Sequence, residues 1–259
     1  MSLLSVEDAI AQITARIRPL EAAPIALNDA LGRVLAQDVS AGRALPAWPT
    51  SSMDGFAVST ADLGAAPASL RLAFDVPAGV MPSQSIGPGE TARIMTGALV
   101  PHGADAVVPV EHTDQHWAAE AAAQIGMLVR FDRTAHAGDC IRPVGEDIGL
   151  GQRVLAAGTV LRAPEIGLLA MLGLPSVSVI RQPRVAIVST GDELVEPGTP
   201  LAPGQIYDAN AYALAALVRS WGAMALRVPI ARDTLSSVRE AFQHALAHQP
   251  DLILSSAGV

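Results

Sequence analysis

The final third of the chain alternates between short apolar runs and helix-forming segments, and this alternation constrains the fold more than any other feature. RVAIVST predicts a buried strand, NAYALAALVRSWG predicts a helix closed by Gly222, and TLSSVREAFQHALAH predicts an amphipathic helix. The predicted order is a strand over residues 184–190, a helix over 210–222, a strand over 223–231, a helix over 234–248 and a strand over 251–256. Because right-handed crossovers join strands in this order, we expect a parallel sheet covered by helices.

The preceding part of the chain has a different pattern of apolar, Gly and Pro residues. Between about residues 43 and 132, Gly and Pro interrupt short apolar runs such as SLRLAF, TARIM, DAVVPVE and IGMLVRF, a pattern typical of a small β-barrel or sandwich. Ahead of it, apolar residues recur at helical spacing behind a predicted N-cap, Ser5: Val6, Ile10, Ile13 and Ile17. A further helix is predicted to begin near Pro164.

Composition excludes several classes of function. A net charge of -8 argues against nucleic-acid binding, and all 17 basic residues are Arg, so a P-loop lysine and a Schiff-base lysine are both absent. The single Cys140 has no partner for an internal disulfide, which fits a reducing compartment. Glu7 and Asp8 stand where a signal peptide has positive charge, and no run of about eighteen apolar residues occurs. We therefore expect a cytoplasmic protein with no membrane partner.

Polar residues follow all three predicted parallel strands, where open parallel sheets bind their ligands. The second strand runs into Arg232 and Asp233. The first runs into Ser189, Thr190, Gly191, Asp192 and Glu193, and the third into Ser255, Ser256, Ala257 and Gly258. Asp233 has an alternative role as the N-cap of the following helix. Asp192 and Glu193 have an alternative interpretation as residues of a solvent-exposed turn. Asp208 is a predicted helix cap. Acidic residues at this edge would need a cation such as Mg²⁺ to bind an anionic substrate.

Six stretches occur in an order that carries a resemblance. They are SSMDGFAV (51–58), RIMTGALVPHGADAVVPVE (93–111), IRPVGEDI (141–148), STGDELVEPG (189–198), GQIYDAN (204–210) and SSAGV (255–259). Together they resemble the molybdopterin molybdenumtransferase family, the molybdenum insertases of molybdenum-cofactor synthesis. Two departures stand out: AWPT precedes SSMDG where relatives commonly have an Asp-Asn pair, and Ala257-Gly258 replaces a Gly-Gly.

The resemblance implies a multi-domain protein with α+β and α/β parts. Residues 1–180 would form an elongated N-terminal module with an inserted β-barrel at about 45–140, and residues 181–259 an incomplete three-layer α/β molybdopterin-binding domain. Relatives continue beyond this point, so a chain stopping at Val259 is expected to be truncated. The family acts as a homodimer with its cleft between the α/β domain of one subunit and the barrel of the other.

The reaction implied by the resemblance takes adenylylated molybdopterin and molybdate, releases AMP and leaves molybdenum on the dithiolene sulfurs, using Mg²⁺. The catalytic candidates are Asp54, Thr96 and Glu193, and the candidate metal ligands are Asp192, Glu193 and Asp233. The substrate-binding candidates are Arg142, Asp147, Ser189, Thr190, Gly191, Ser256 and Gly258. Thr96 would donate to an oxyanion, and Gly97 would let a backbone amide approach it.

Alternatives remain for both the residues and the whole chain. Asp54 and Gly97 have a structural reading as a turn acid and a turn glycine, and Asp147 has one as an ion-pair partner of Arg142. Cys140 is interpreted as a small residue packed inside the protein, with no chemical role. The alternative function is a non-catalytic molybdopterin-binding or scaffold protein, or an inactive fragment of the enzyme. A further expected partner is the molybdopterin adenylyltransferase, as donor of the adenylylated pterin.

Overall fold

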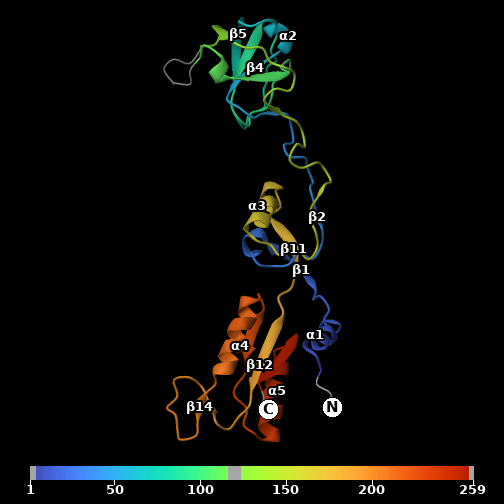
Figure 1. Cartoon of the computed structure of the whole chain (residues 1–259), viewed down its shortest axis with the longest axis vertical. Coiled ribbons are helices and arrows are strands. Elements are labelled where there is room, and N and C mark those ends of the chain that lie inside the picture. Colours follow the sequence, from blue (N-terminus) through green and yellow to red (C-terminus); the bar gives the residue numbers. More distant parts are fainter. Residues whose placement is uncertain (1–3, 116–123, 257–259) are drawn as a thin grey trace. The chain divides into compact units, whose positions relative to one another are not determined.

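The computed structural model describes residues 4–115 and 124–256 (Figure 1). The chain forms two compact units, one from Met1–Val39 with Leu155–Val259 and the other from Ser40–Val154. The chain thus leaves the first unit, builds the second as an insertion, and returns. This division differs from the predicted boundary at residues 180 and 181, because residues on both sides of that boundary fall in the first unit. The predicted domain limits stay a prediction, and each unit is described by itself below.

The inserted unit is built on one five-stranded sheet. Its strand order is β7-β4-β6-β5-β8, in which β4 is antiparallel to both β6 and β7, and β5 is parallel to β6 and antiparallel to β8. The strands are β4 (Gly55–Val58), β5 (Ala68–Val76), β6 (Glu90–Ile94), β7 (Ala106–Pro109) and β8 (Leu128–Phe131). A bridge between Thr113 and Phe131 brings the segment after β7 beside β8, so the sheet curls towards closure.

The core of this unit lies inside the curled sheet. Side chains of β5 alternate, with Leu70, Leu72 and Phe74 buried, as the period of a half-buried strand requires. Phe56 and Phe131 are fully buried and meet edge to face, with ring centroids 6.0 Å apart. The short elements of the unit are β3 (Thr50–Ser51), α2 (Thr60–Leu63), the 3-10 helix η2 (Val110–His112) and β9 (Ile141–Arg142), with β2 (Val39–Ser40) and β10 (Arg153–Leu155) at its limits. Sequence and structure agree on a barrel-like inserted part.

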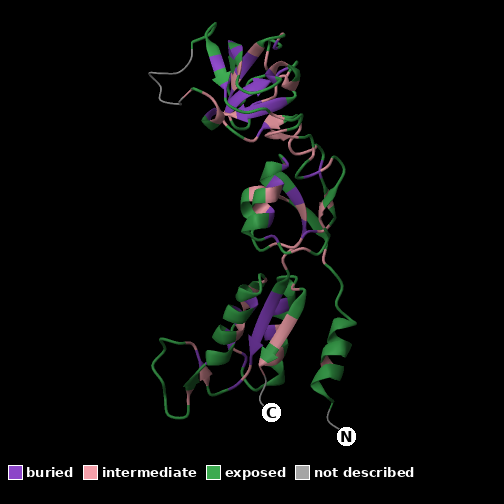
Figure 2. Ribbon diagram, turned by 45° about the horizontal axis from the view of Figure 1, so that its top comes forward, coloured by how far each residue is buried: buried purple, intermediate pink, exposed green. Residues whose placement is uncertain are grey.

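The C-terminal part of the first unit is a three-layer α/β structure (Figures 1 and 2). Its parallel sheet has the order β15-β12-β16, so β12 lies in the middle and is buried over most of its length. Its elements are β12 (Arg184–Ser189), β13 (Leu194–Val195), β14 (Ile206–Tyr207), α4 (Ala209–Ser220), β15 (Met224–Arg227), α5 (Leu235–Ala247) and β16 (Leu252–Ser256). Ala186 and Val188 pack with α5, whereas Ile187 packs with α4. The helices therefore cover opposite faces, which confirms the predicted fold class.

Two local predictions for this part were wrong. The predicted strand over 223–231 ends at Arg227, because Pro229 has no amide hydrogen for the ladder, and pairing resumes only where Ala231 donates to Ser189. The N-cap of α5 is Thr234, whose hydroxyl accepts from the amide of Ser237, so Asp233 precedes the cap. By contrast Asp208 caps α4, accepting from the amide of Ala211 at 3.0 Å, as predicted.

The rest of the first unit surrounds an antiparallel pair of strands. β1 (Ala22–Ala26) pairs with β11 (Ser176–Ile180), and both pack with α3 (Ala163–Met171) around the buried side chains of Leu35, Leu161 and Leu169. The 3-10 helix η1 (Leu27–Asp29) follows β1. Helix α1 (Val6–Thr14) begins behind Ser5, which accepts from the amide of Asp8 as predicted. In residues 4–115 and 124–256, no helix has the length and apolar character needed to cross a bilayer.

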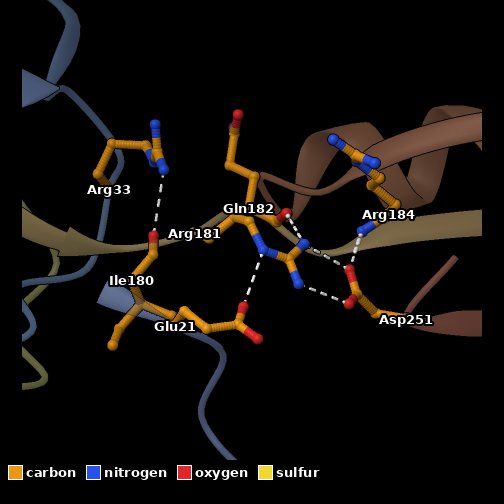
Figure 3. Close-up of polar contacts among 7 residues, drawn as sticks. All are labelled: Glu21, Arg33, Ile180, Arg181, Gln182, Arg184 and Asp251. Carbon is orange, nitrogen blue, oxygen red and sulfur yellow. Dashed lines mark hydrogen bonds and ion pairs between the residues drawn. The ribbon is translucent and has the colours of Figure 1, made fainter. Parts of the chain in front are cut away.

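Arg181 joins β1, the chain entering β12 and the start of β16 (Figure 3). Its Nη1 and Nη2 each lie 2.8 Å from an oxygen of Asp251, and its Nε lies 3.1 Å from Glu21. Asp251 also accepts from the amide of Arg184 at 2.7 Å. The hydrogen bonds from Arg181 and from that amide lower the pKa of Asp251 to about 2. The cluster ties together segments 70 residues apart.

The titration of Asp251 predicts acid-sensitive stability. Because its folded pKa of about 2 lies below its ordinary value of 3.8, the carboxylate stabilises the fold above about pH 4. This contribution is lost as the pH falls from about 4 to about 2. An Asp251→Asn variant is expected to melt at a lower temperature at pH 7, with the difference from the unaltered chain shrinking towards pH 2. Thermal unfolding over this pH range measures it, and a difference independent of pH would contradict the assignment.

Candidate functional site at the carboxyl edge of the parallel sheet

The loops after β12 and β15 are joined by crossed hydrogen bonds between two acidic residues. The amide of Asp233 donates to Oδ1 of Asp192 at 3.2 Å, and the amide of Asp192 approaches Oδ2 of Asp233 at 3.4 Å. Arg232 adds a hydrogen bond of 2.8 Å from its Nη1 to the carbonyl oxygen of Asp192. Both acids are exposed. The parallel strands thus bring two carboxylates from separate loops to one edge, as the strand-end rule predicts.

Glu193 adopts a position that the sequence did not predict. Its carboxylate folds back over the α-carbon of Gly191, so that a β-carbon at position 191 would lie 2.7 and 2.8 Å from its two oxygens. Glycine therefore leaves the space that the glutamate occupies. Within the described part of the chain, the Glu193 carboxylate has no hydrogen-bond donor. It is exposed and remains available to a ligand.

The other predicted substrate residues of this edge serve the sheet itself. Ser189 is buried, and its hydroxyl lies 3.3 Å from that of Ser256 on the neighbouring strand. Thr190 bridges to Ala231, and the amide of Gly191 donates to the Ala231 carbonyl at 3.0 Å. These contacts position the acidic loop, and a substrate-binding role for these residues stays a prediction. Gly258 lies outside the described residues.

The acidic edge of the sheet could hold Mg²⁺ through two carboxylates. Over the described ranges, no group of three or more His, Cys, Asp or Glu is arranged to hold a metal ion, so Asp192, Glu193 and Asp233 do not form a three-ligand site. The fit rests on Asp192 and Asp233, each of which uses one carboxylate oxygen in the crossed hydrogen bonds. Mg²⁺ commonly takes one or two carboxylates and completes its shell with water and substrate phosphate.

In the inserted unit, Asp54 and Thr96 form one hydrogen-bonded turn. Oδ1 of Asp54 accepts from the amide of Thr96 at 2.7 Å and from its hydroxyl at 2.8 Å. The amide of Gly97 donates to the carbonyl of Ser51 at 2.8 Å, and Gly97 has a φ of 79°. In the structure these donors hold the two loops together, and their predicted contact with an oxyanion stays a prediction. The two candidates are adjacent, and the half-buried Asp54 carboxylate is held in a fixed orientation.

Arg142 makes the ion pair that the sequence left open as an alternative. Its Nε donates to Glu146 at 2.7 Å and its Nη2 donates to Asp147 at 2.5 Å. The hydrogen bonds to these two carboxylates raise the pKa of Arg142, and the bond to Asp147 has the larger effect. Because the guanidinium of Arg142 already binds two carboxylates, it has no excess positive charge with which to bind an oxyanion. Cys140 packs partly buried against the core of the inserted unit, as its structural reading predicts.

A second polar group near this edge was missed by sequence reasoning. Tyr212, Glu196 and Arg227 come from α4, the loop after β13 and the end of β15, and they contact one another. A pocket of about 570 Å³ lies against the last two of these residues and Arg232. No local motif marks the group, because its members are far apart in the sequence. The one indication in the sequence was Glu196, the acidic residue two positions after the GDEL stretch.

Two protein-family models match most of the chain. Residues 4–173 match the model of the MoeA N-terminal region (domain I and II), and residues 186–259 match that of a probable molybdopterin binding domain. The chain is 41% identical over 232 residues to a molybdopterin molybdenumtransferase of Nostoc sp., covering 88% of this chain and 51% of the relative. It is 40% identical over 254 residues to molybdopterin molybdenumtransferase 2 of Mycobacterium tuberculosis, covering 96% and 60%.

A solved structure shares the same arrangement of elements. The crystal structure of a molybdopterin biosynthesis MoeA protein from Pyrococcus horikoshii superposes with a TM-score of 0.85 at 30% identity, covering 99% of this chain and 64% of that chain. The chain spans between 51% and 60% of the length of the two curated relatives above. The family models together match nearly all of its residues. The chain belongs to the molybdopterin molybdenumtransferase (MoeA) family.

Proposed function

We propose that this chain acts in molybdenum cofactor biosynthesis by inserting molybdenum from molybdate into adenylylated molybdopterin, with release of AMP. The observation that carries the proposal is the crossed pair of Asp192 and Asp233, which holds two exposed carboxylates at the ligand-binding edge of a parallel sheet. The family membership supports the choice of substrate, because relatives are named molybdopterin molybdenumtransferase.

Each side chain has a role that its position supports. Asp192 and Asp233 would hold Mg²⁺, which supplies charge neutralisation to phosphate oxygens when bound. Glu193 is the candidate general base, because its carboxylate is exposed and has no hydrogen-bond donor in the described part of the chain. It would take a proton from a water molecule that attacks the pyrophosphate, whose bridging P–O bond breaks to give AMP and the phosphate of molybdopterin. Arg232 positions the loop by binding the Asp192 carbonyl.

Asp54 and Thr96 act as a second acidic group, in the inserted unit. Two donors of Thr96, its amide and its hydroxyl, orient the Asp54 carboxylate. An oriented carboxylate can accept a hydrogen bond from a substrate hydroxyl, amine or bound water. We assign Asp54 to substrate positioning and Thr96 to orienting Asp54.

A single assay tests the proposal. The purified chain is incubated with adenylylated molybdopterin, molybdate and Mg²⁺, and AMP release is followed. We expect release that depends on molybdate and stops when EDTA removes the cation. A folded chain that binds molybdopterin but releases no AMP would overturn the enzymatic proposal in favour of a non-catalytic pterin-binding protein or an inactive fragment.

We also propose that the chain forms a homodimer through α1. Four apolar residues of α1 and the turn after it are between 57% and 70% exposed: Val6, Ile10, Ile13 and Ile17. A row of this kind is typical of an interaction surface. A cytoplasmic location fits the lone Cys140, and the molybdopterin adenylyltransferase is the proposed donor of the substrate.

A charge on this row is expected to break the dimer. Ile10→Glu should shift the molar mass measured by light scattering from dimer to monomer, because burying an unpaired carboxylate is costly. Gln12→Glu introduces the same charge on another face of the helix and should leave the mass unchanged. A dimer that survives Ile10→Glu would exclude α1 from the interface.

A further inference from the structure

Two histidines lie one helical turn apart at the C-terminal end of α5. His244 is in the last turn of the helix, and His248 is its C-terminal cap residue, with a φ of -88° and a ψ of 5°. The chain leaves the helix only at Gln249, whose φ is 51°. Residues four apart on a helix are neighbours on its surface. The two imidazole rings therefore lie together, and both are exposed.

The nitrogens of these two rings are unused. Among residues 4–115 and 124–256, neither ring has a partner for a hydrogen bond or an ion pair. By contrast, His112 and His136 each lie beside an aspartate, at 3.7 and 3.6 Å. A neutral imidazole carries a lone pair on one ring nitrogen, which is the group that binds transition-metal ions. Each of the two histidines of α5 therefore has a metal-binding nitrogen available to solvent.

The spacing of the two rings fits one metal ion between them. The ring centroids are 5.2 Å apart, and the ring planes are inclined by 42°. For a zinc–nitrogen bond of about 2.1 Å and a tetrahedral angle at the metal, the centres of two coordinated imidazoles lie about 5 Å apart. The pair thus needs little rearrangement to bind one ion through both rings.

The position at the end of the helix also favours a cation. The last carbonyl groups of a helix carry a partial negative charge, which stabilises a positive charge at the last turn. The chain as a whole has a net charge of -8. Both the local and the overall charge therefore attract a metal ion to this end of α5.

The ligand type separates this pair from the acidic edge of the sheet. Imidazole nitrogens bind Zn²⁺, Cu²⁺ and Ni²⁺, whereas Mg²⁺ prefers carboxylate, carbonyl and water oxygens. In the part of the chain that the structure describes, no third His, Cys, Asp or Glu joins the two histidines in a metal-binding group. Water would therefore fill the remaining positions around the ion.

We propose that His244 and His248 form a two-histidine site for a divalent transition-metal ion, which bridges the last turn of α5. Such a site is additional to the Mg²⁺ site of the proposed reaction and does not depend on that reaction. An ion held by both rings would also fix the end of the helix, so its binding should raise the melting temperature.

Titration of metal ions into the full chain tests the site. Zn²⁺ and Cu²⁺ are added in the presence of excess Mg²⁺, and binding is followed by calorimetry. We expect one ion to depend on the histidine pair. His244→Gln and His248→Gln should each weaken its binding by about 10²-fold or more, because one imidazole has lost its partner. Electron paramagnetic resonance of bound Cu²⁺ should show coupling to two imidazole nitrogens in the unaltered chain and to one in either variant.

Two controls separate the geometry of the pair from the mere presence of histidines. A double variant, His244→Gln with Gln243→His, keeps the number of histidines but places one five residues before His248. Because residues five apart do not share a face, it should bind as weakly as the single variants. His102→Gln removes an exposed histidine of the inserted unit and should change nothing.

Three results would overturn the proposal. They are an unaltered chain that binds neither ion, binding that neither single substitution weakens, and a double variant that binds as tightly as the unaltered chain. All the altered residues are exposed, so melting temperatures measured without metal should be equal and show that each variant is folded. No pterin substrate is used, so these results are independent of whether the chain releases AMP.

Discussion

Glu193→Gln is expected to lower the rate of AMP release by about 10²–10⁴-fold. Glutamine keeps the size and the hydrogen-bonding capacity of the side chain but cannot accept a proton at neutral pH. The residue is exposed and its carboxylate lies over the α-carbon of Gly191, so the fold and the melting temperature should not change. AMP release under saturating substrate measures the effect. Unchanged turnover would remove Glu193 from the catalytic group.

Two variants calibrate this result. Glu240→Gln alters an exposed glutamate of α5 and should retain full activity. Gly191→Ala places a β-carbon 2.7 Å from the Glu193 carboxylate, which must then move away from its present position. Because Gly191 also has a φ of 155°, alanine there strains the backbone as well, so we expect a loss of rate together with a lower melting temperature. A fully active Gly191→Ala protein would show that this orientation of Glu193 is not required.

Gly55→Ala is expected to destabilise the inserted unit by about 3 kcal/mol. Gly55 lies in β4 between β6 and β7 and directly follows Asp54. A β-carbon there would lie 2.9 Å from the carbonyl carbon of Val108, closer still to its oxygen, and 3.0 Å from the α-carbon of Pro109. These are backbone atoms of a paired strand, so the sheet itself must shift. We expect the melting temperature to fall by roughly 10 °C or more.

The matched control is Gly42→Ala in the same unit. A β-carbon at position 42 meets no atom within 4 Å, so this variant should melt within about 2 °C of the unaltered chain. Calorimetry or circular dichroism of both variants gives the comparison. Equal melting temperatures for the two would show that the backbone around Gly55 adjusts freely. In that case the glycine after Asp54 would not be required by packing.

The secondary structure of the α/β part was largely predictable. Its helices α4 and α5 and its central strand β12 follow from apolar periodicity, which is a local property of the sequence. The strand order of the inserted unit was not predictable, because β5 pairs in parallel with β6 and this depends on long-range contacts. Pro229 ended β15 early for a local reason that the apolar pattern concealed.

The candidate site was predicted in part. The strand-end rule brought Asp192 and Asp233 to one edge, and the resemblance named Asp54 and Thr96 as candidates, which the structure joins by hydrogen bonds. The rule does not say which way a loop side chain turns, so the fold of Glu193 over Gly191 was not foreseen. Nor does it choose between substrate and acid as the partner of Arg142, which binds Glu146 and Asp147.

The sequence by itself indicated the main helices and strands of the α/β part, its parallel sheet, the family and the acidic edge, because these follow from local patterns, a general rule of handedness and the order of the motifs. The tertiary structure decided which charges are paired and which remain available. Arg181 meets Asp251 across 70 residues, and Arg227 meets Glu196 across 31. Whether an arginine is neutralised or free to bind an anion depends on such distant contacts, and no local pattern encodes them.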